Sequence, residues 1–446
     1  MIEIIINNKF IPERTYVLDV IAEYLNFDYK LTVNKTVENV EFHFNGKKII
    51  IIDVFFSKFV DGTKYLNSQN IPQSIAFGEC EFISENNIPI LFGTNNIKIE
   101  EQEIICGIDI IASIFFMLTR WEEITIKTLD SHSRFPASES VAFKNIFLHR
   151  PVVDEYIMFF YKMLYKIGYS GNVKHRKFEI TLTHDIDYFY KWSNFSKFLK
   201  TLAGDILVRK KLKVLFSNIS LYYKIQKNKA LDPNDSFDYF MNLAEKAGIK
   251  SHFFFMSGGK TKNDNHYEIA NTKVHEKLNQ IIEREHIIGI HPSYETYLDK
   301  NQFQHEKMLI EKLTLKKLTC GRQHYLRFEI PTTWQIWDDL GFEWDSSMYY
   351  SEKMGFRSGA CFEYNVFNCL TRQKLNLREK PLIVMDTSIL NDKKTSWEIH
   401  KKNIKDLFEK VKKYNGNFVI LWHNSNVNTY ESAKIKKLFE TMLEKD

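Results

Sequence analysis

The sequence has few cysteines, and they form no recognisable framework. Only five of the 446 residues are cysteines, and none belongs to a Cys-x-x-Cys pair. An odd number of cysteines without close pairs argues against a disulfide framework and against a zinc site made of thiolates. The scarcity of cysteine therefore favours a reducing compartment.

A long hydrophobic run and a secretory leader are missing as well. The longest apolar stretch, residues 104–118, is interrupted by Asp109 and is too short to span a bilayer. Residues 1–8 contain no basic region and no small-residue cleavage site, so they resemble a first strand and not a signal peptide. We therefore expect a cytoplasmic protein.

The chain also lacks a large excess of charge of one sign. Its formal net charge is +5, which is too small at this length to indicate a nucleic-acid partner. With 44% hydrophobic and 26% charged residues, the composition is that of a globular protein long enough for two or three domains.

Residues 1–170 are predicted to form an α+β domain of unknown role. Strands are expected at 2–6, 40–44 and 48–54, and helices at 108–123 and 152–165. No residues in this region have the spacing expected of a catalytic motif. Residues 168–177 are the expected linker.

From residue 178 onward strands and helices alternate, which indicates a parallel sheet or barrel. About seven strands are expected, one short of a closed eightfold barrel. We therefore predict an α/β fold in which an irregular (β/α)7 barrel, residues 177–446, follows the smaller α+β domain. The expected strands are 178–187, 249–256, 287–291, 318–322, 342–346, 382–386 and 418–423. The expected helices are 237–247, 272–285, 304–317, 331–340 and 397–414.

Two aspartates end the first of these strands on the same face. Side chains alternate along a strand, so Asp185 and Asp187 share one face about 7 Å apart. Two ionised carboxylates this close raise one another's pKa, and a bound cation relieves the repulsion. The structural alternative is a turn or a helix cap, in which such a pair is common.

Further polar residues are expected at the carboxyl ends of other strands. In (β/α) barrels the active groups cluster at these ends. His291, Arg322 and His423 have this position together with the two aspartates. The sequence thus predicts a catalytic site there.

A long basic segment lies between the first expected strand, residues 178–187, and the helix expected at 237–247. Residues 190–234 include apolar residues at helical spacing beside six basic ones: Lys197, Lys200, Arg209, Lys210, Lys211 and Lys213. Within it, residues 194–213 can form a basic amphipathic helix, which suits peripheral contact with an anionic membrane. The alternative is a solvated lid over the barrel mouth.

Five motifs in residues 177–445 resemble the polysaccharide deacetylases with a NodB-type domain, family four of the carbohydrate esterases. A less-studied branch of deacetylase-like proteins with an added N-terminal region is also similar. The motifs are Thr183-His-Asp-Ile-Asp, Ser251-His-Phe-Phe-Phe-Met, Ile288-Gly-Ile-His-Pro-Ser-Tyr, Gly321-Arg-Gln-His-Tyr-Leu-Arg and Ile420-Leu-Trp-His-Asn.

The resemblance implies roles for five residues. Asp185 would be the general base, Arg322 would orient it, and His423 would be the general acid. Asp187 and His291 would bind a divalent metal, most simply Zn²⁺.

The third metal ligand departs from the family pattern. Glu295 stands where the family has a second histidine, and it shares a face with His291 only if Pro292 opens a helical turn. His324 follows Arg322 by two residues on an extended segment and offers an imidazole nitrogen. We prefer His324 and keep Glu295 as the alternative.

The resemblance further implies hydrolysis of an N-acetyl or O-acetyl group on a saccharide or glycolipid, in surface polysaccharide or glycolipid biosynthesis. Arg327, Arg357 and Trp422 are candidate substrate contacts. Two other functions stay open. One is an inactive sugar-binding or regulatory barrel, and the other is a metal-dependent hydrolase of a different amide.

Overall fold

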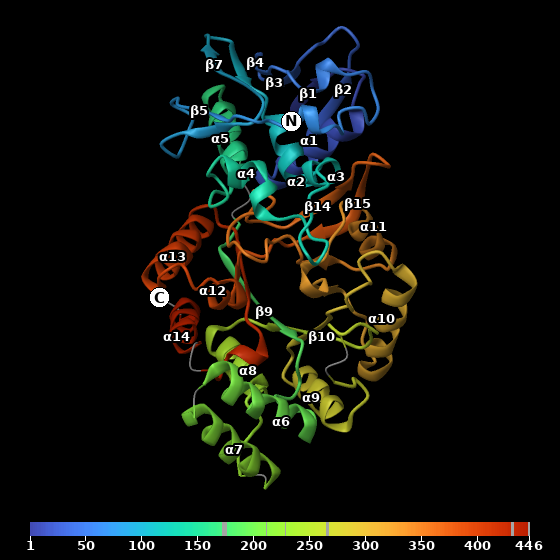
Figure 1. The fold of residues 1–446 in the computed structure, drawn as a ribbon. Helices are drawn as coiled ribbons and strands as arrows, with labels where there is room; N and C mark the ends of the chain where they lie inside the picture. Colours follow the sequence, from blue (N-terminus) through green and yellow to red (C-terminus); the bar gives the residue numbers. More distant parts are fainter. Residues whose placement is uncertain (172–175, 211, 228, 265–266, 430–431, 445–446) are drawn as a thin grey trace. The chain divides into compact units, whose positions relative to one another are not determined.

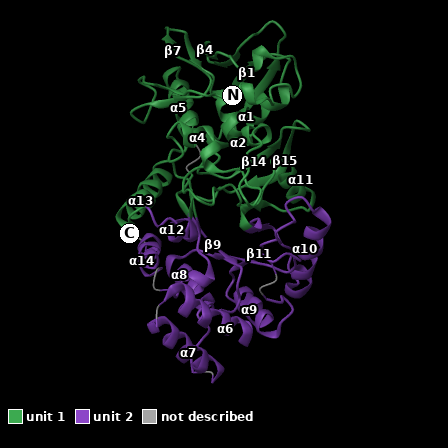
Figure 2. Ribbon diagram, in the orientation of Figure 1, with its two compact units in different colours: residues 1–179, 325–384, 395–419 green, residues 180–324, 385–394, 420–446 purple. Residues whose placement is uncertain are grey.

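A computed structural model describes the chain except for residues 172–175, 211, 228, 265–266, 430–431 and 445–446 (Figure 1). The chain folds into two compact units, each mixed α/β (Figure 2). Unit 1 comprises residues 1–179, 325–384 and 395–419, and unit 2 comprises residues 180–324, 385–394 and 420–446.

The N-terminal part of unit 1 is a six-stranded mixed sheet in the order β2-β1-β3-β4-β8-β7. In β1 the buried residues alternate with less buried ones, because one face of the strand packs on the core. The sheet strands are β1 (Ile2–Ile6), β2 (Tyr29–Val33), β3 (Val40–Phe44), β4 (Lys47–Ile51), β7 (Gly93–Ile99) and β8 (Glu103–Ile108). A two-stranded sheet joins β5 (Ala76–Gly78) and β6 (Ile88–Ile90), and the helices of this part are α1 (Ile11–Leu25), α2 (Ile110–Thr119), α3 (Glu122–Thr125), α4 (Val141–Lys144) and α5 (Val152–Lys166).

The apolar stretch at residues 104–118 is a buried strand followed by a buried helix. Asp109 separates β8 from α2 and caps the helix, since its carboxylate accepts a hydrogen bond from the backbone N–H of Ala112 at 3.0 Å. All ten residues of α2 are buried. The predicted helix at 108–123 therefore begins too early, since Ile108 belongs to β8, and it is interrupted at Arg120, whose left-handed conformation (φ 53°) ends α2 before α3 begins at Glu122.

The C-terminal segments of unit 1 contain a β-hairpin that the sequence did not indicate. β14 (Tyr364–Asn368) and β15 (Gln373–Glu379) pair antiparallel, and β13 (Trp344–Asp345) pairs parallel with β15. The connecting turn contains no glycine and β15 is rich in exposed polar residues, so neither the turn nor the strand has a strong local signal. The helices here are α11 (Thr332–Asp339) and α13 (Trp397–Lys413).

Unit 2 is organised on four parallel strands in the order β12-β11-β10-β9. Helices alternate with them along the chain, as the sequence predicts. The strands are β9 (Glu179–Ile186), β10 (Ser251–Phe255), β11 (Ile287–Ile290) and β12 (Cys320–Gly321), and the connecting helices are α8 (Phe237–Ala247), α9 (Thr272–Glu283) and α10 (Lys300–Thr314).

The remaining elements complete the two units. In unit 2 the excursion after β9 folds into α6 (Phe195–Gly204), a π-helical turn (Asp205–Arg209) and α7 (Leu212–Gln226), and α12 (Asp386–Asn391) and α14 (Ala433–Leu443) follow later. Two short strands are β16 (Val384–Met385) and β17 (Asn417–Leu421). The 3₁₀ helices are Phe56–Lys58, Ser68–Asn70, Ala137–Glu139, His324–Leu326 and Asn424–Asn426.

Several expectations concern the chain as a whole. None of the five cysteines, all within the described part of the chain, forms a disulfide. No described helix is long and apolar enough to cross a bilayer. A closed (β/α)7 barrel would need strands from both units and stays a prediction, as does the division into domains at 1–170 and 177–446.

Candidate active site

The register of the parallel strands brings the candidate residues to one edge of unit 2. Phe255 of β10 is opposite Ile186 of β9 and Ile290 of β11, and Ile290 is opposite Gly321 of β12. The next residue along three of these strands is Asp187, His291 or Arg322. The carboxyl ends of parallel strands meet at the same edge, so these side chains come together there.

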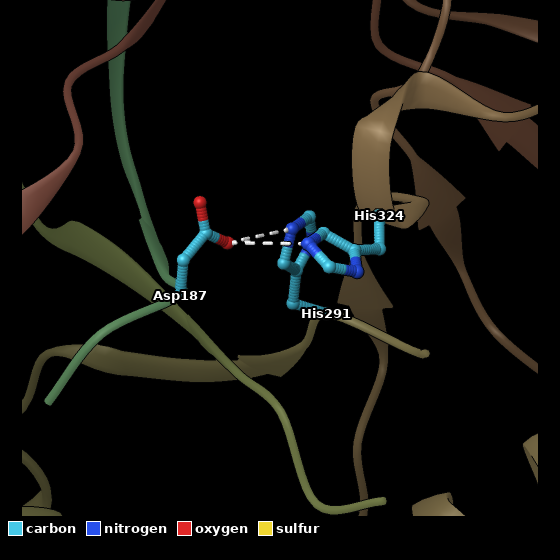
Figure 3. Close-up of side chains that lie close together, drawn as sticks. All are labelled: Asp187, His291 and His324. Atoms are coloured by element: carbon cyan, nitrogen blue, oxygen red, sulfur yellow. Dashed lines mark ion pairs between the residues drawn. The ribbon is translucent and has the colours of Figure 1, made fainter. Parts of the chain in front are cut away.

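Three side chains at this edge form a cluster that could hold a metal ion. Asp187, His291 and His324 each offer one ligand atom, and these atoms lie within 4.8 Å of one another (Figure 3). The Nε2 atoms of His291 and His324 lie 3.2 Å and 3.7 Å from Oδ1 of Asp187. Both imidazoles point at the same carboxylate oxygen.

Hydrogen bonds at the other ring nitrogen fix the orientation of both histidines. Nδ1 of His291 donates to the backbone carbonyl of Arg322 at 2.7 Å, and Nδ1 of His324 donates to the carboxylate of Asp264 at 3.3 Å. In the neutral form of each ring, a proton on Nδ1 leaves the lone pair on Nε2. In each ring this lone pair is therefore directed to the cluster, as a metal ligand requires.

The donor set fits a divalent cation. Oδ1 of Asp187 is buried and accepts no hydrogen bond of normal geometry from any described residue, although two imidazole nitrogens face it. A cation between these atoms would satisfy all three. Two imidazoles and one carboxylate match the ligand set of catalytic zinc sites, in which a fourth position stays open for water or substrate.

The charges of the cluster favour an ionised Asp187. Burial raises the pKa of this carboxyl, but the neighbouring His291, His423 and His324 outweigh burial and lower the pKa overall. Burial lowers the pKa of His324, whereas the pKa of His291 is raised, because the charges of Asp185 and Asp187 outweigh its burial. A deprotonated carboxylate and neutral imidazoles are the forms that bind metal.

Asp185 is held by Arg322 beside the cluster. Oδ1 of Asp185 accepts a hydrogen bond from Nη1 of Arg322 at 2.8 Å, and both side chains are buried. The other oxygen, Oδ2, lies 3.8 Å from Nε2 of His291. Asp185 in β9 and Asp187 just after it thus face the same imidazole, as the alternation of side chains along a strand predicts.

His423 reaches the same edge from the end of β17. The backbone N–H of Trp422 donates to the carbonyl of Thr183 at 3.0 Å, which aligns the end of β17 with β9. Nε2 of His423 then lies 3.8 Å from Oδ2 of Asp187. The sequence-predicted residues Asp185, Asp187, His291, Arg322, His324 and His423 are therefore all brought together in unit 2.

A carboxylate that sequence reasoning missed holds His423. Nδ1 of His423 donates to Oδ1 of Asp386 at 2.6 Å, and the backbone N–H of His423 donates to Oδ2 of Asp386 at 3.0 Å. Burial lowers the pKa of His423, but Asp386, Asp187 and Asp185 raise it to about 10 overall. The available signal was an acid at the end of an expected strand, residues 382–386.

Asp264, the partner of His324, was missed as well. It lies in the loop after β10. Gly259 in the same loop has a positive φ (100°) and contacts Asp264 so closely that a Cβ on residue 259 would clash with the Asp264 side chain. The backbone N–H of Tyr294 donates to Oδ1 of Asp264 at 2.8 Å. No local pattern in the sequence marks this carboxylate.

Glu295, the alternative third ligand, lies outside the cluster. It is exposed in the turn after β11 and does not belong to the three-residue group. Pro292 directs the chain into a turn and not into a helix that would carry Glu295 back beside His291.

The candidate substrate contacts have different surroundings. Trp422 is fully buried against the rings of Tyr239, Phe240 and Phe439, so contact with a substrate would require these rings to move. Arg327 and Arg357 belong to unit 1.

Both arginines have protein partners within unit 1. The Nε atom of Arg327 donates to the carbonyl of His132 at 2.9 Å, and Arg357 forms a buried ion pair with Glu123 at 2.5 Å. Each arginine therefore has a partner within the protein. A role of Arg327 and Arg357 in substrate binding stays a prediction.

Comparisons with known proteins reach different parts of the chain. Residues 2–169 match the model of a family described as a family of unknown function (DUF7033). No curated protein matches the chain.

Solved structures show a distant similarity. A "putative polysaccharide deacetylase from Mycobacterium smegmatis" is 11% identical, with 62% of this chain and 87% of that chain covered and a TM-score of 0.38. A BA3943 mutant, described as a CE4 family pseudoenzyme with restored enzymatic activity, and a second BA3943 mutant structure, described as a CE4 family pseudoenzyme, are each 12% identical over 63% of this chain and 68% of that chain, with a TM-score of 0.30.

Proposed function

We propose that this protein is a metal-dependent hydrolase that removes an acetyl group from an N-acetylated or O-acetylated saccharide. One observation carries the proposal. The Asp185–Arg322 pair and the His423–Asp386 pair both border the Asp187–His291–His324 cluster. A base, an acid and a metal-ligand set within one buried edge are the parts that amide hydrolysis needs.

The cluster would hold a divalent cation, and Zn²⁺ suits its two nitrogens and one oxygen best. When bound, such an ion supplies Lewis-acid activation of a carbonyl group and of the attacking water. This is also the metal that the motif resemblance implies.

Asp185 is the proposed general base. Its carboxylate accepts the proton of the attacking water, while Arg322 fixes the carboxylate in place through Oδ1 and leaves Oδ2 directed at the cluster. The pair is buried, so neither side chain is free to rotate into solvent.

His423 is the proposed general acid. Asp386 keeps its imidazole protonated, and Nε2 faces the cluster, so the ring can donate a proton to the departing sugar nitrogen or oxygen. A pure sugar-binding module has no need of this acid together with the base, which disfavours the inactive-barrel alternative.

Further parts of the proposal rest on the sequence. An acetylated saccharide or glycolipid is the proposed substrate class, in surface polysaccharide or glycolipid biosynthesis, and the proposed location is the cytoplasm. Arg327, Arg357 and Trp422 stay candidate substrate contacts.

The test combines metal analysis with an acetate-release assay. We expect the purified full-length protein to contain close to one equivalent of a divalent metal and to release acetate from some member of a panel of N-acetylated and O-acetylated saccharides. Chelation should abolish the release, and Zn²⁺ should restore it. Bound metal without acetate release from any saccharide, together with release of formate or ring opening of a cyclic amide, would instead establish the other-amide hydrolase.

A further inference from the structure

The segment after β9 concentrates the positive charge of the protein. Residues 194–229, which we call the basic hairpin, contain nine lysines and arginines and a single acid, Asp205, a formal charge of +8. The whole chain carries +5, so all other residues together carry −3. The basic hairpin is thus a strongly positive segment of a chain whose other residues together carry a small negative charge.

The two helices of the hairpin, α6 and α7, pack through an internal seam. The rings of Phe198 and Tyr222 stack with centroids 3.9 Å apart, and Trp192 packs against both. Nδ2 of Asn218 donates to the buried carboxylate of Asp205 at 2.7 Å. These contacts hold the hairpin together and use the residues that face inward.

The tip of the hairpin exposes apolar side chains. Ile206, Leu207 and Val208 are consecutive and 51%, 73% and 81% exposed, and Leu212 and Phe216 just beyond are each 65% exposed. Soluble proteins rarely expose large apolar side chains in such a contiguous group unless the group binds something. The five residues therefore mark an interaction surface.

Cations flank these apolar residues directly. Arg209, Lys210 and Lys213 are all exposed and alternate with them along the chain. Helices with apolar residues beside lysines and arginines lie in the interface of a membrane, with the apolar side chains among the headgroups and the cations on anionic lipid phosphates. We propose that the basic hairpin docks the protein on the surface of an anionic phospholipid bilayer.

Other occupants fit the hairpin less well. A second copy of the chain would bring two segments of charge +8 together, which like-charge repulsion opposes. A nucleic acid would use the cations but would leave the five apolar side chains in water. An anionic bilayer uses both sets of side chains at once.

The proposal is independent of acetyl hydrolysis, because docking is measured without turnover. The full-length protein is sedimented with vesicles of phosphatidylcholine alone or with added phosphatidylglycerol, at low and high salt. We expect binding to the anionic vesicles only, and weaker binding at high salt because salt screens the cations.

Two sets of substitutions separate the charge from the apolar contribution. Lys210→Gln with Lys213→Gln should weaken partitioning about fivefold for each lysine, about 25-fold together. Leu207→Ser, Val208→Ser and Leu212→Ser combined should weaken it at least about tenfold. A matched control, Leu315→Ser with Lys316→Gln and Lys317→Gln, removes exposed residues of the same kinds after α10 and should bind as the parent does.

A measurement on the unaltered protein complements the variants. Hydrogen exchange in peptides of the hairpin tip should slow when anionic vesicles are added and stay unchanged with phosphatidylcholine alone. The proposal is overturned if the parent fails to bind anionic vesicles at low salt. It is also overturned if the serine variant binds as the parent does, or if homopolymeric RNA binds more tightly than the vesicles.

Discussion

Nδ1 of His423 lies 2.6 Å from Oδ1 of Asp386, a residue 37 positions earlier in the chain. The second oxygen of the same carboxylate accepts the backbone N–H of His423, so the pair is joined at two points. The carboxylate stabilises the imidazolium, and the pKa of His423 rises to about 10 although burial opposes the rise. The histidine therefore carries a proton at neutral pH.

The His423–Asp386 pair predicts how the rate of hydrolysis depends on pH. If His423 acts as an acid, activity falls when it loses its proton, so the alkaline limb of the rate profile reports its pKa. Asp386→Asn removes the negative charge that stabilises the imidazolium. We expect the alkaline limb to move to lower pH, toward the ordinary histidine value of about 6.5.

Two further variants complete this experiment. His423→Ala should remove the alkaline limb altogether, and Asp392→Asn, which removes a carboxylate just beyond α12, should leave the profile as in the parent. An unchanged alkaline limb in Asp386→Asn and in His423→Ala would assign the acid to another residue.

Asp185→Asn tests the general base. Asparagine keeps an oxygen that can accept the hydrogen bond of Arg322, and none of the three clustered ligands is altered. We expect the variant to bind metal as the parent does and to lose turnover by about 10²–10⁴-fold, the usual contribution of acid–base catalysis. Acetate release at the parental rate would show that another group takes the proton.

The third metal ligand is tested by metal content. His324→Ala removes a nitrogen from the cluster, so the bound metal after dialysis should fall sharply. Glu295→Ala removes an exposed carboxylate outside the cluster and should leave the metal content almost unchanged. The opposite ranking would make Glu295 the ligand.

Asp264 is predicted to act through His324. Its carboxylate holds the Nδ1 proton of this ring and so directs the Nε2 lone pair to the cluster. Loss of such an outer partner typically weakens metal affinity about 10–100-fold, and we expect a loss of this size in Asp264→Asn by competition with a chelator. Asp299→Asn, at the start of α10, is a surface control, and equal metal affinity in the Asp264 variant and this control would contradict the role of Asp264.

Much of the site follows from local patterns in the sequence. The alternation of apolar and polar residues at 178–187 identifies a strand, and the period of two puts Asp185 and Asp187 on the same face. The helical periodicity at residues 237–247 matches α8 (Phe237–Ala247), and Gly248 ends it in a left-handed conformation. Such features depend on residues that are close in the chain.

The sequence did not predict structural features that have only a weak local pattern. β15 is rich in polar residues and the turn that joins it to β14 contains no glycine, so the local signal for this hairpin is weak. The end of α2 is set by the left-handed conformation of Arg120, which glycine or asparagine usually adopts at this position.

The sequence by itself determined which residues end strands and which of them share a face, because the strand period is a local property of the chain. Only the tertiary structure decided the partners of these residues. Asp185 meets Arg322 across 137 positions and His324 meets Asp264 across 60, and such pairings depend on strand register and loop paths. The same long-range packing buries Trp422 among aromatic rings and leaves Glu295 in water, because burial is a property of the folded surface and not of spacing in the sequence.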